Sequence, residues 1–156
     1  MTQSFIKKIV LVEELESLTK DLEEIFEKDN EEFTHACGLK HDIKLMLTSF
    51  SHESLLTWNA HVWGHFNGEK WDGIFIGILR KSEKFNKKMF DEYLWLSKNS
   101  NAGMKLYKIA LDFAKNKECE FVTMNVIENH PLSSKIKKMY KMLGFEKDSE
   151  TYIKKI

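Results

Sequence analysis

Apolar and polar positions alternate with clear periods along the first half of the chain. Between residues 11 and 26, apolar side chains recur every three or four positions with acidic ones between them, which predicts an amphipathic helix of about four turns. An apolar run at 5–11 predicts a strand before it. Residues 55–66 alternate with period two, as in a half-buried strand, and 71–79 is apolar on both faces, as in a central strand. The Asn-Gly pair at 67–68 predicts a hairpin between them.

The second half of the chain predicts strands that alternate with helices. A polar connection at 81–88 leads to a strand at 89–96. A polar turn then precedes a helix at 104–115, and a strand follows at 121–127. The last helix has Ser133 or Ser134 as its expected N-cap and ends at Gly144, a favourable residue just past a helix end.

Two stretches of the chain predict little secondary structure. Residues 28–40 have no firm period and lead toward a further helix around 43–47. After Gly144 there is room for one short strand pair at most, with Tyr152 and Ile153 as its apolar content. The elements together predict a single domain over 1–156 of the α/β (α+β) class, with a mixed sheet flanked by helices.

Composition and charge narrow the function classes. The chain has 156 residues, 42% hydrophobic and 31% charged, which is typical of one soluble domain. It contains neither a membrane-length apolar run nor a secretory leader, and we expect no membrane partner. The formal net charge of zero argues against a nucleic-acid partner. Cys37 and Cys119 lack metal-ligand spacing, so we expect no metal site and a cytoplasmic setting.

The polar turn at 97–103 is the first candidate site. A strand that enters a helix leaves the first-turn N–H groups unpaired, and the helix dipole makes them a site for phosphate or pyrophosphate. Asn101 tolerates positive φ better than most residues, Ala102 and Gly103 leave the approach unobstructed, and Lys98 and Lys105 add charge. The alternative is a strand-to-helix connection with an ordinary cap, which spacing alone favours.

The order of these features resembles the GCN5-related N-acetyltransferase (GNAT) superfamily, which binds acetyl-CoA. The resemblance rests on a strand, the turn Lys98-Asn99-Ser100-Asn101-Ala102-Gly103, a helix, a strand, Asn129, and Tyr140-Lys141-Met142-Leu143-Gly144-Phe145. The Tyr-x-x-x-Gly-Phe segment is the more specific part. The turn departs from the (Arg/Gln)-x-x-Gly-x-Gly pattern, since Lys98 and Asn101 replace the Arg or Gln and the first Gly.

The resemblance implies a GNAT-like fold with a mostly antiparallel sheet, an acetyl-CoA co-substrate and direct acetyl transfer to a primary amine. Tyr140 would be the general acid and Glu92 the general base, although an aromatic core residue and a solvent-facing carboxylate are the alternatives. The backbone near Leu96 would polarise the thioester carbonyl. Asn129 would bond the pantetheine arm, cap the following helix, or both. The implied cofactor-binding residues are Leu96, Ser97, Lys98, Asn101, Ala102, Gly103, Met104, Lys105 and Asn129.

Several alternatives stay open from the sequence. The acceptor can be a small-molecule amine or a protein amine, and a homodimer is compatible with the chain. A second hypothesis is a non-catalytic binding or structural protein on the same scaffold, for example from a phage particle, because fold does not determine function. His61 and His65 share a strand face, which is a weak pattern for a metal pair and is simpler as part of the acceptor side or the surface.

Overall fold

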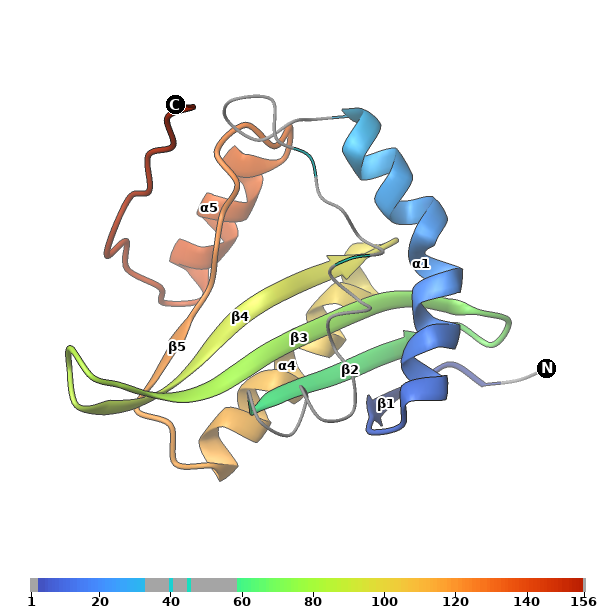
Figure 1. Cartoon of the computed structure of the whole chain (residues 1–156), viewed down its shortest axis with the longest axis horizontal. Helices are drawn as coiled ribbons and strands as arrows, with labels where there is room; N and C mark the ends of the chain where they lie inside the picture. Colours follow the sequence, from blue (N-terminus) through green and yellow to red (C-terminus); the bar gives the residue numbers. More distant parts are fainter. Residues whose placement is uncertain (1–2, 33–39, 41–44, 46–58, 156) are drawn as a thin grey trace.

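The computed structural model describes residues 3–32, 40, 45 and 59–155, which form a five-stranded sheet with helices on both faces (Figure 1). The strand order is β1-β2-β3-β4-β5, antiparallel up to β4, with β5 parallel to β4. The strands are β1 (Phe5–Ile9), β2 (Ala60–Phe66), β3 (Trp71–Ser82), β4 (Lys87–Ser97) and β5 (Phe121–Thr123). The helices are α1 (Val12–Glu32), α4 (Ser100–Asn116) and α5 (Ser133–Met142). This confirms the predicted fold class and the mostly antiparallel mixed sheet.

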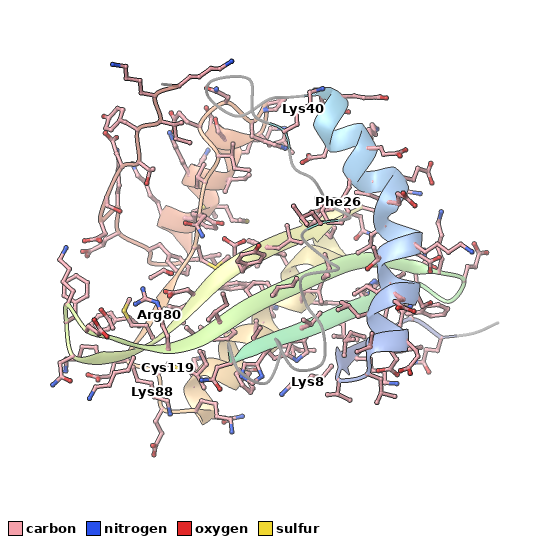
Figure 2. The ribbon with its side chains drawn as sticks, viewed as in Figure 1. Lys8, Phe26, Lys40, Arg80, Lys88 and Cys119 are labelled. Carbon is pink, nitrogen blue, oxygen red and sulfur yellow. The ribbon has the colours of Figure 1, made fainter. Side chains whose placement is uncertain are left out.

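The core has two layers, one on each face of the sheet. The apolar stripe of α1 packs on one face, where Leu18, Leu22 and Phe26 are almost fully buried against β2, β3 and β4. Phe26 is labelled in Figure 2, where it lies between α1 and the sheet. On the opposite face, Leu106 of α4 packs with a cluster that includes Phe90. Burial on both faces explains why the β3 sequence is apolar throughout.

The two predicted connections around β3 have different outcomes. Asn67 closes the β2–β3 hairpin through its N–H to the Lys70 carbonyl (3.0 Å), and Gly68 has φ of 105°, which confirms the hairpin. The prediction of a polar connection over 81–88 is wrong, because Lys81 and Ser82 pair with 87–88 and extend the β3–β4 ladder. Backbone bonds hold a hairpin end together whatever the polarity of its exposed side chains.

Several predicted boundaries also require correction. α4 begins at Ser100 and so includes residues that the sequence assigned to the turn, and β5 is confined to 121–123. α5 is capped at Leu132 without a side-chain bond, so neither Ser133 nor Ser134 is its N-cap. No strand forms over 145–155. The expected helix around 43–47 lies, except for Leu45, outside the described residues.

Among the described residues, no helix combines the length and the apolar character that crossing a membrane requires. α1 is the longest helix described, and its outward face is acidic.

Candidate functional site

β4 and β5 pair over only a few residues and then separate. Residues 89–91 pair in parallel with 121–123, and beyond them β5 continues toward α5 while β4 runs toward the start of α4 (Figure 1). Within the described part of the chain, no strand pairs with Leu94–Ser97 on the side away from β3. We call this segment the open edge of β4. Its backbone groups can bond an extended ligand as a further strand would.

A β-bulge lies where the two strands part. Residues 76 and 77 of β3 pair with Leu94 and Glu92, so Tyr93 is the additional residue in β4. The insertion reverses the alternation of the strand: Phe90 packs on the α4 side of the sheet, whereas Leu94, four positions later, packs on the α1 side. The bulge therefore re-aims β4 at the point where Glu92 meets the end of β5.

Glu92 is 9% exposed, and its carboxylate is held by Asn125, the second residue after β5. The Asn125 N–H donates to Glu92 Oε2 at 3.0 Å, and its Nδ2 donates to the same oxygen at 3.2 Å and to the Glu92 main-chain carbonyl at 2.8 Å. Burial raises the pKa of Glu92, and the bonds from Asn125 act in the opposite direction. This carboxylate accepts a proton more readily than an exposed one, as a general base requires.

Tyr140 is fixed by the way α5 ends. Gly144 has φ of 86° and donates its N–H to the Lys141 carbonyl, and the Phe145 N–H reaches back to the Tyr140 carbonyl at 2.9 Å. These two bonds form a Schellman motif, which needs Gly at the left-handed position. The rings of Tyr140 and Phe145 pack with centroids 5.4 Å apart, which is the apolar contact that accompanies this motif. The Tyr-x-x-x-Gly-Phe pattern is thus a device for ending a helix and orienting its tyrosine.

The Tyr140 hydroxyl points to the same residue that holds Glu92. It donates to the Asn125 carbonyl at 3.1 Å. Burial raises the pKa of Tyr140 strongly, and the nearby charge of Glu92 and the Tyr107 phenol raise it further. The phenol is therefore protonated at neutral pH. The structure brings together the two side chains that the sequence suggested as base and acid.

The start of α4 is capped by the chain itself. Asn99 accepts from the Ala102 N–H through its side chain (2.8 Å) and from the Gly103 N–H through its carbonyl (3.1 Å). Within the described residues, no protein group accepts from the N–H groups of Ser100 and Asn101. The helix start thus keeps two donors for a ligand.

The small residues of this turn serve the packing of the protein itself. A Cβ on Gly103 would lie 2.6 Å from the Ser97 hydroxyl, and Trp95 Nε1 donates to the Gly103 carbonyl at 3.1 Å. Ala102 is buried as well. Asn101 does not have positive φ, since it lies in the first turn of α4, so the expected reason for its presence is wrong. Close packing of α4 on β4 thus accounts for Gly103 and for the burial of Ala102.

The other predicted cofactor residues surround this helix start. Leu96 packs against the α1-side core, and the Ser97 hydroxyl donates to the Asn99 carbonyl at 2.7 Å. The Lys98 and Lys105 side chains are exposed, whereas Met104 is half-buried. The two lysines are therefore accessible to an anion, whereas Leu96 is half-buried and pairs with Ile74 of β3.

Asn129 is not brought to this site by any bond within the described residues. It is exposed in the turn closed by the His130 N–H and the Ile127 carbonyl (3.1 Å), and α5 is capped at Leu132. The alternative that Asn129 caps the last helix is therefore wrong.

A buried acid lies beside the start of α4. Asp72 is 3% exposed, its Oδ1 is 2.5 Å from His65 Nδ1, and its carbonyl accepts from the Lys98 N–H at 2.8 Å. Asn99 Nδ2 is 3.5 Å from Asp72 Oδ2. Within the described residues, no group of three or more His, Cys, Asp or Glu side chains could ligate a metal ion. His65 is paired with Asp72. Asp72 and His65 thus hold the turn at the end of β4.

Comparisons with known proteins identify the fold. No family model matches the sequence, and no curated protein matches it. Among solved structures, a Pyrococcus furiosus protein assigned as an acetyl transferase is 17% identical, with a TM-score of 0.72 over 99% of this chain and 100% of that one. A predicted acetyltransferase from Clostridium acetobutylicum, solved with acetyl-CoA, is 11% identical (TM-score 0.68; 99% and 96% covered). An aminoglycoside acetyltransferase from a soil metagenomic sample, in complex with trehalose, is 14% identical (TM-score 0.66; 98% and 96% covered).

The chain has the GNAT fold. The similarity covers nearly the full length of both chains, so it includes β1–β3 as well as the two segments on which the sequence resemblance rests. At these identities the similarity establishes the architecture, and the chemistry depends on the side chains at the β4–β5 junction.

Two residues at this junction of the GNAT fold were missed from the sequence. The sequence predicts Asn125 only as part of a strand over 121–127, and Tyr107 only as a residue of the helix over 104–115. Tyr107 stacks on Trp95 (5.7 Å between centroids) and lies 6.4 Å from Phe145, so it joins α4 to the end of α5. The polar residue that interrupts the apolar run at 121–127 was the available signal for Asn125. Its partner could not be read from the sequence, because the bulge at Tyr93 decides it.

Proposed function

We propose that this protein transfers an acetyl group from acetyl-CoA directly to a primary amine. The observation that carries the proposal is the meeting of Glu92 and Tyr140 at Asn125, where β4 and β5 separate. A buried carboxylate with a raised pKa and a protonated phenol, both beside an open strand edge, supply a base and an acid in one place.

Glu92 takes the proton that the acceptor ammonium must lose before its nitrogen can attack the thioester carbonyl. The new C–N bond forms, the C–S bond breaks, and the departing thiolate receives the Tyr140 proton. Tyr140 regains its proton from the nitrogen, which must lose a second proton to become an amide, and Glu92 releases its proton to solvent, so the net products are the amide, the free thiol and one proton. No covalent enzyme intermediate is required, and within the described residues Cys119 is half-buried with a pKa raised by burial, which does not suit a nucleophile.

The co-substrate would lie along the open edge of β4 with its pyrophosphate at the start of α4. The N–H groups of Ser100 and Asn101 and the ammonium groups of Lys98 and Lys105 are the donors for the phosphates. The backbone of Ser97 on this edge, and that near Leu96, would bond the pantetheine amides and polarise the thioester carbonyl. Ala102, Gly103 and Met104 belong to the first turns of α4, which would lie beneath the phosphates.

The acceptor is an amine whose size the similar structures leave open. They include a ribosomal-protein-alanine N-acetyltransferase of Brucella melitensis and the soil aminoglycoside acetyltransferase in complex with sisomicin. The name of the Brucella enzyme indicates a protein amine as its acceptor, whereas the soil enzyme is solved with an aminoglycoside, a small amino sugar. We therefore propose a primary amine as the acceptor class and a cytoplasmic setting, where acetyl-CoA is available.

The test is release of free thiol from acetyl-CoA in the presence of a panel of amines, namely amino sugars, polyamines, amino acids and peptides with free N-termini. We expect amine-dependent release with at least one of these acceptors, and loss of that release in Glu92→Gln and Tyr140→Phe. Thiol release that is independent of amine, or unchanged in both variants, would contradict the proposal.

A non-catalytic binding protein is the second candidate, because Asn99 already occupies the Ala102 N–H at the start of α4. Such a protein would show no amine-dependent release with any acceptor.

A further inference from the structure

We propose that Asn125 is the positioning residue of this centre: it holds the Glu92 carboxylate for proton uptake and orients the Tyr140 hydroxyl, so that one residue links the base to the acid. The inference rests on the proposed acetyl transfer and deepens it. It assigns a role to a residue that neither the family resemblance nor the sequence pattern singled out. Three kinds of group on Asn125 contribute, namely its N–H, its side-chain amide and its carbonyl.

The side chain of Asn125 replaces strand pairing where β5 leaves the sheet. In a continuing ladder, the Glu92 carbonyl would accept from a backbone N–H of β5. Here Asn125 Nδ2 takes that place at 2.8 Å and also reaches Glu92 Oε2 at 3.2 Å. The Asn125 N–H is directed to the same oxygen at 3.0 Å instead of to a backbone carbonyl. The strand bonds are thus converted into bonds to a carboxylate, which fixes its position without an ion pair.

The same residue sets the charge state of Glu92. Two N–H donors on one buried oxygen favour the ionised carboxylate, and in this way they oppose the desolvation that raises its pKa. Without the side-chain donor, Glu92 would take up its proton at higher pH and would be lost as a base over more of the working range. Asn125 therefore extends to lower pH the range in which Glu92 is ionised and can act as a base.

Asn125 also places the acid next to the base. Its carbonyl accepts from the Tyr140 hydroxyl at 3.1 Å, so the phenol and the Glu92 carboxylate both bond Asn125. The negative charge of Glu92 is among the causes that raise the pKa of Tyr140. Proton uptake by Glu92 removes that charge and makes the phenol a better donor. The chemistry requires the amine to be deprotonated before the thiolate is protonated, and this arrangement favours that order.

The test compares Asn125→Ala with a matched variant, Thr123→Val. Thr123 lies two residues earlier in β5, and its hydroxyl donates to Asp91 Oδ1 at 2.6 Å, so it also ties β5 to an acid of β4 but does not touch Glu92. We expect Asn125→Ala to lower kcat/KM about tenfold at about pH 6 and much less at about pH 8, because the acidic limb of the profile moves to higher pH. Thr123→Val should leave the shape of the profile unchanged. Equal shifts in both variants, or none in Asn125→Ala, would overturn the positioning role.

A second readout does not require activity. The Glu92 carboxyl can be followed by carbon-13 NMR across a pH titration and assigned by its absence in Glu92→Gln. Its midpoint should move to higher pH in Asn125→Ala and further in Asn125→Asp, where a second carboxylate opposes ionisation. Asn125→Ser, which retains a short donor, should lie nearer the parent protein and serves if the alanine variant fails to fold. An unmoved midpoint contradicts the inference, whereas a moved midpoint in a protein that transfers no acetyl group would contradict only the proposed function.

Discussion

The start of α4 and the end of α5 are two helix ends beside the same strand, yet their residues leave different groups available. At the start of α4, Asn99 takes the Ala102 N–H, and the buried Asp72 lies behind it. At the end of α5, the Schellman motif uses only backbone groups and Gly144, and it leaves the Tyr140 side chain to reach Asn125. One helix end satisfies part of its own binding capacity, and the other exists to orient a functional group.

The turn at 98–103 and the Tyr-x-x-x-Gly-Phe segment therefore differ in their value as guides to function. The turn departs from the family pattern at Lys98 and Asn101, and in the structure it is a capped helix start with two donors left. The Tyr-x-x-x-Gly-Phe segment keeps the pattern, and every residue of it that the pattern names has a physical role. We therefore expect variants at the base and acid to cost more than variants at the helix start.

The largest effect is expected for Glu92→Gln. It should lower kcat/KM by about 10²–10³-fold, because the amine loses its proton acceptor. Since burial raises the pKa of Glu92, the folded state binds that proton more tightly than the unfolded state, and the ionised carboxylate lowers stability above this pKa. The variant should therefore be more stable at neutral pH, by about 1 kcal/mol, and this gain should shrink as the pH falls. Denaturant unfolding at two pH values checks the second part, and lower stability at neutral pH would contradict it.

Tyr140→Phe comes next, with an expected fall in kcat of about 10–100-fold and little change in the KM for acetyl-CoA. Phenylalanine keeps the ring contact with Phe145, so the helix end should survive. Tyr152→Phe is the control, since the Tyr152 phenol is exposed, donates to Glu150 Oε2 at 2.6 Å and does not bond Asn125. Steady-state kinetics of both variants check this. An equal loss in the control would contradict the assignment of the acid.

Gly144→Ala tests the helix end itself. Because φ is 86° at this position, a Cβ introduces strain of about 1 kcal/mol, although no neighbouring atom obstructs it. The strain should lower the free energy of unfolding by that amount and reduce kcat severalfold by displacing Tyr140. Gly144→Asn should cost less, because Asn tolerates positive φ. Chemical denaturation and kinetics on the same samples compare the two; a fully stable Gly144→Ala variant would show that the motif does not constrain the tyrosine.

The smallest effect is expected at the start of α4. Asn99→Gly keeps a tolerated N-cap residue and releases the Ala102 N–H, so the KM for acetyl-CoA should fall about threefold at a stability cost of a few tenths of a kcal/mol. Asn99→Ser retains a capping side chain and should leave that KM near the parent value. Weaker binding in Asn99→Gly would mean that Asn99 itself contacts the co-substrate, and the contrast between the two helix ends would then be smaller.

Much of the fold could be predicted because local patterns determine it. The stripe of α1, the Asn-Gly turn and the apolar β3 each follow from side-chain periodicity or turn chemistry. The start of α4 was misplaced because a polar Ser-Asn-Ala-Gly segment is compatible with either a turn or a capped first turn, and the Asn99 cap decides. β5 was predicted too long because its apolar run continues after its partner has turned away at the bulge.

In the candidate site, too, residues marked by local sequence could be predicted, whereas a residue whose role depends on a distant contact could not. The family resemblance singled out Tyr140 through a contiguous motif and Glu92 through a strand position where the family often has an acid, and in the structure both bond the same residue. Asn125 could not, because its role depends on a bond between residues 33 positions apart, and that bond depends on where two strands separate. Such a relation leaves no periodic signal.

Calorimetric titration of the protein with acetyl-CoA tests the central claim most directly. If the open edge of β4 and the start of α4 receive the pantetheine and the pyrophosphate, acetyl-CoA should bind with a micromolar Kd. The affinity should weaken severalfold as salt rises, because Lys98 and Lys105 face the phosphates. Absence of binding at millimolar acetyl-CoA would contradict the account and leave the junction of Glu92, Asn125 and Tyr140 without a substrate.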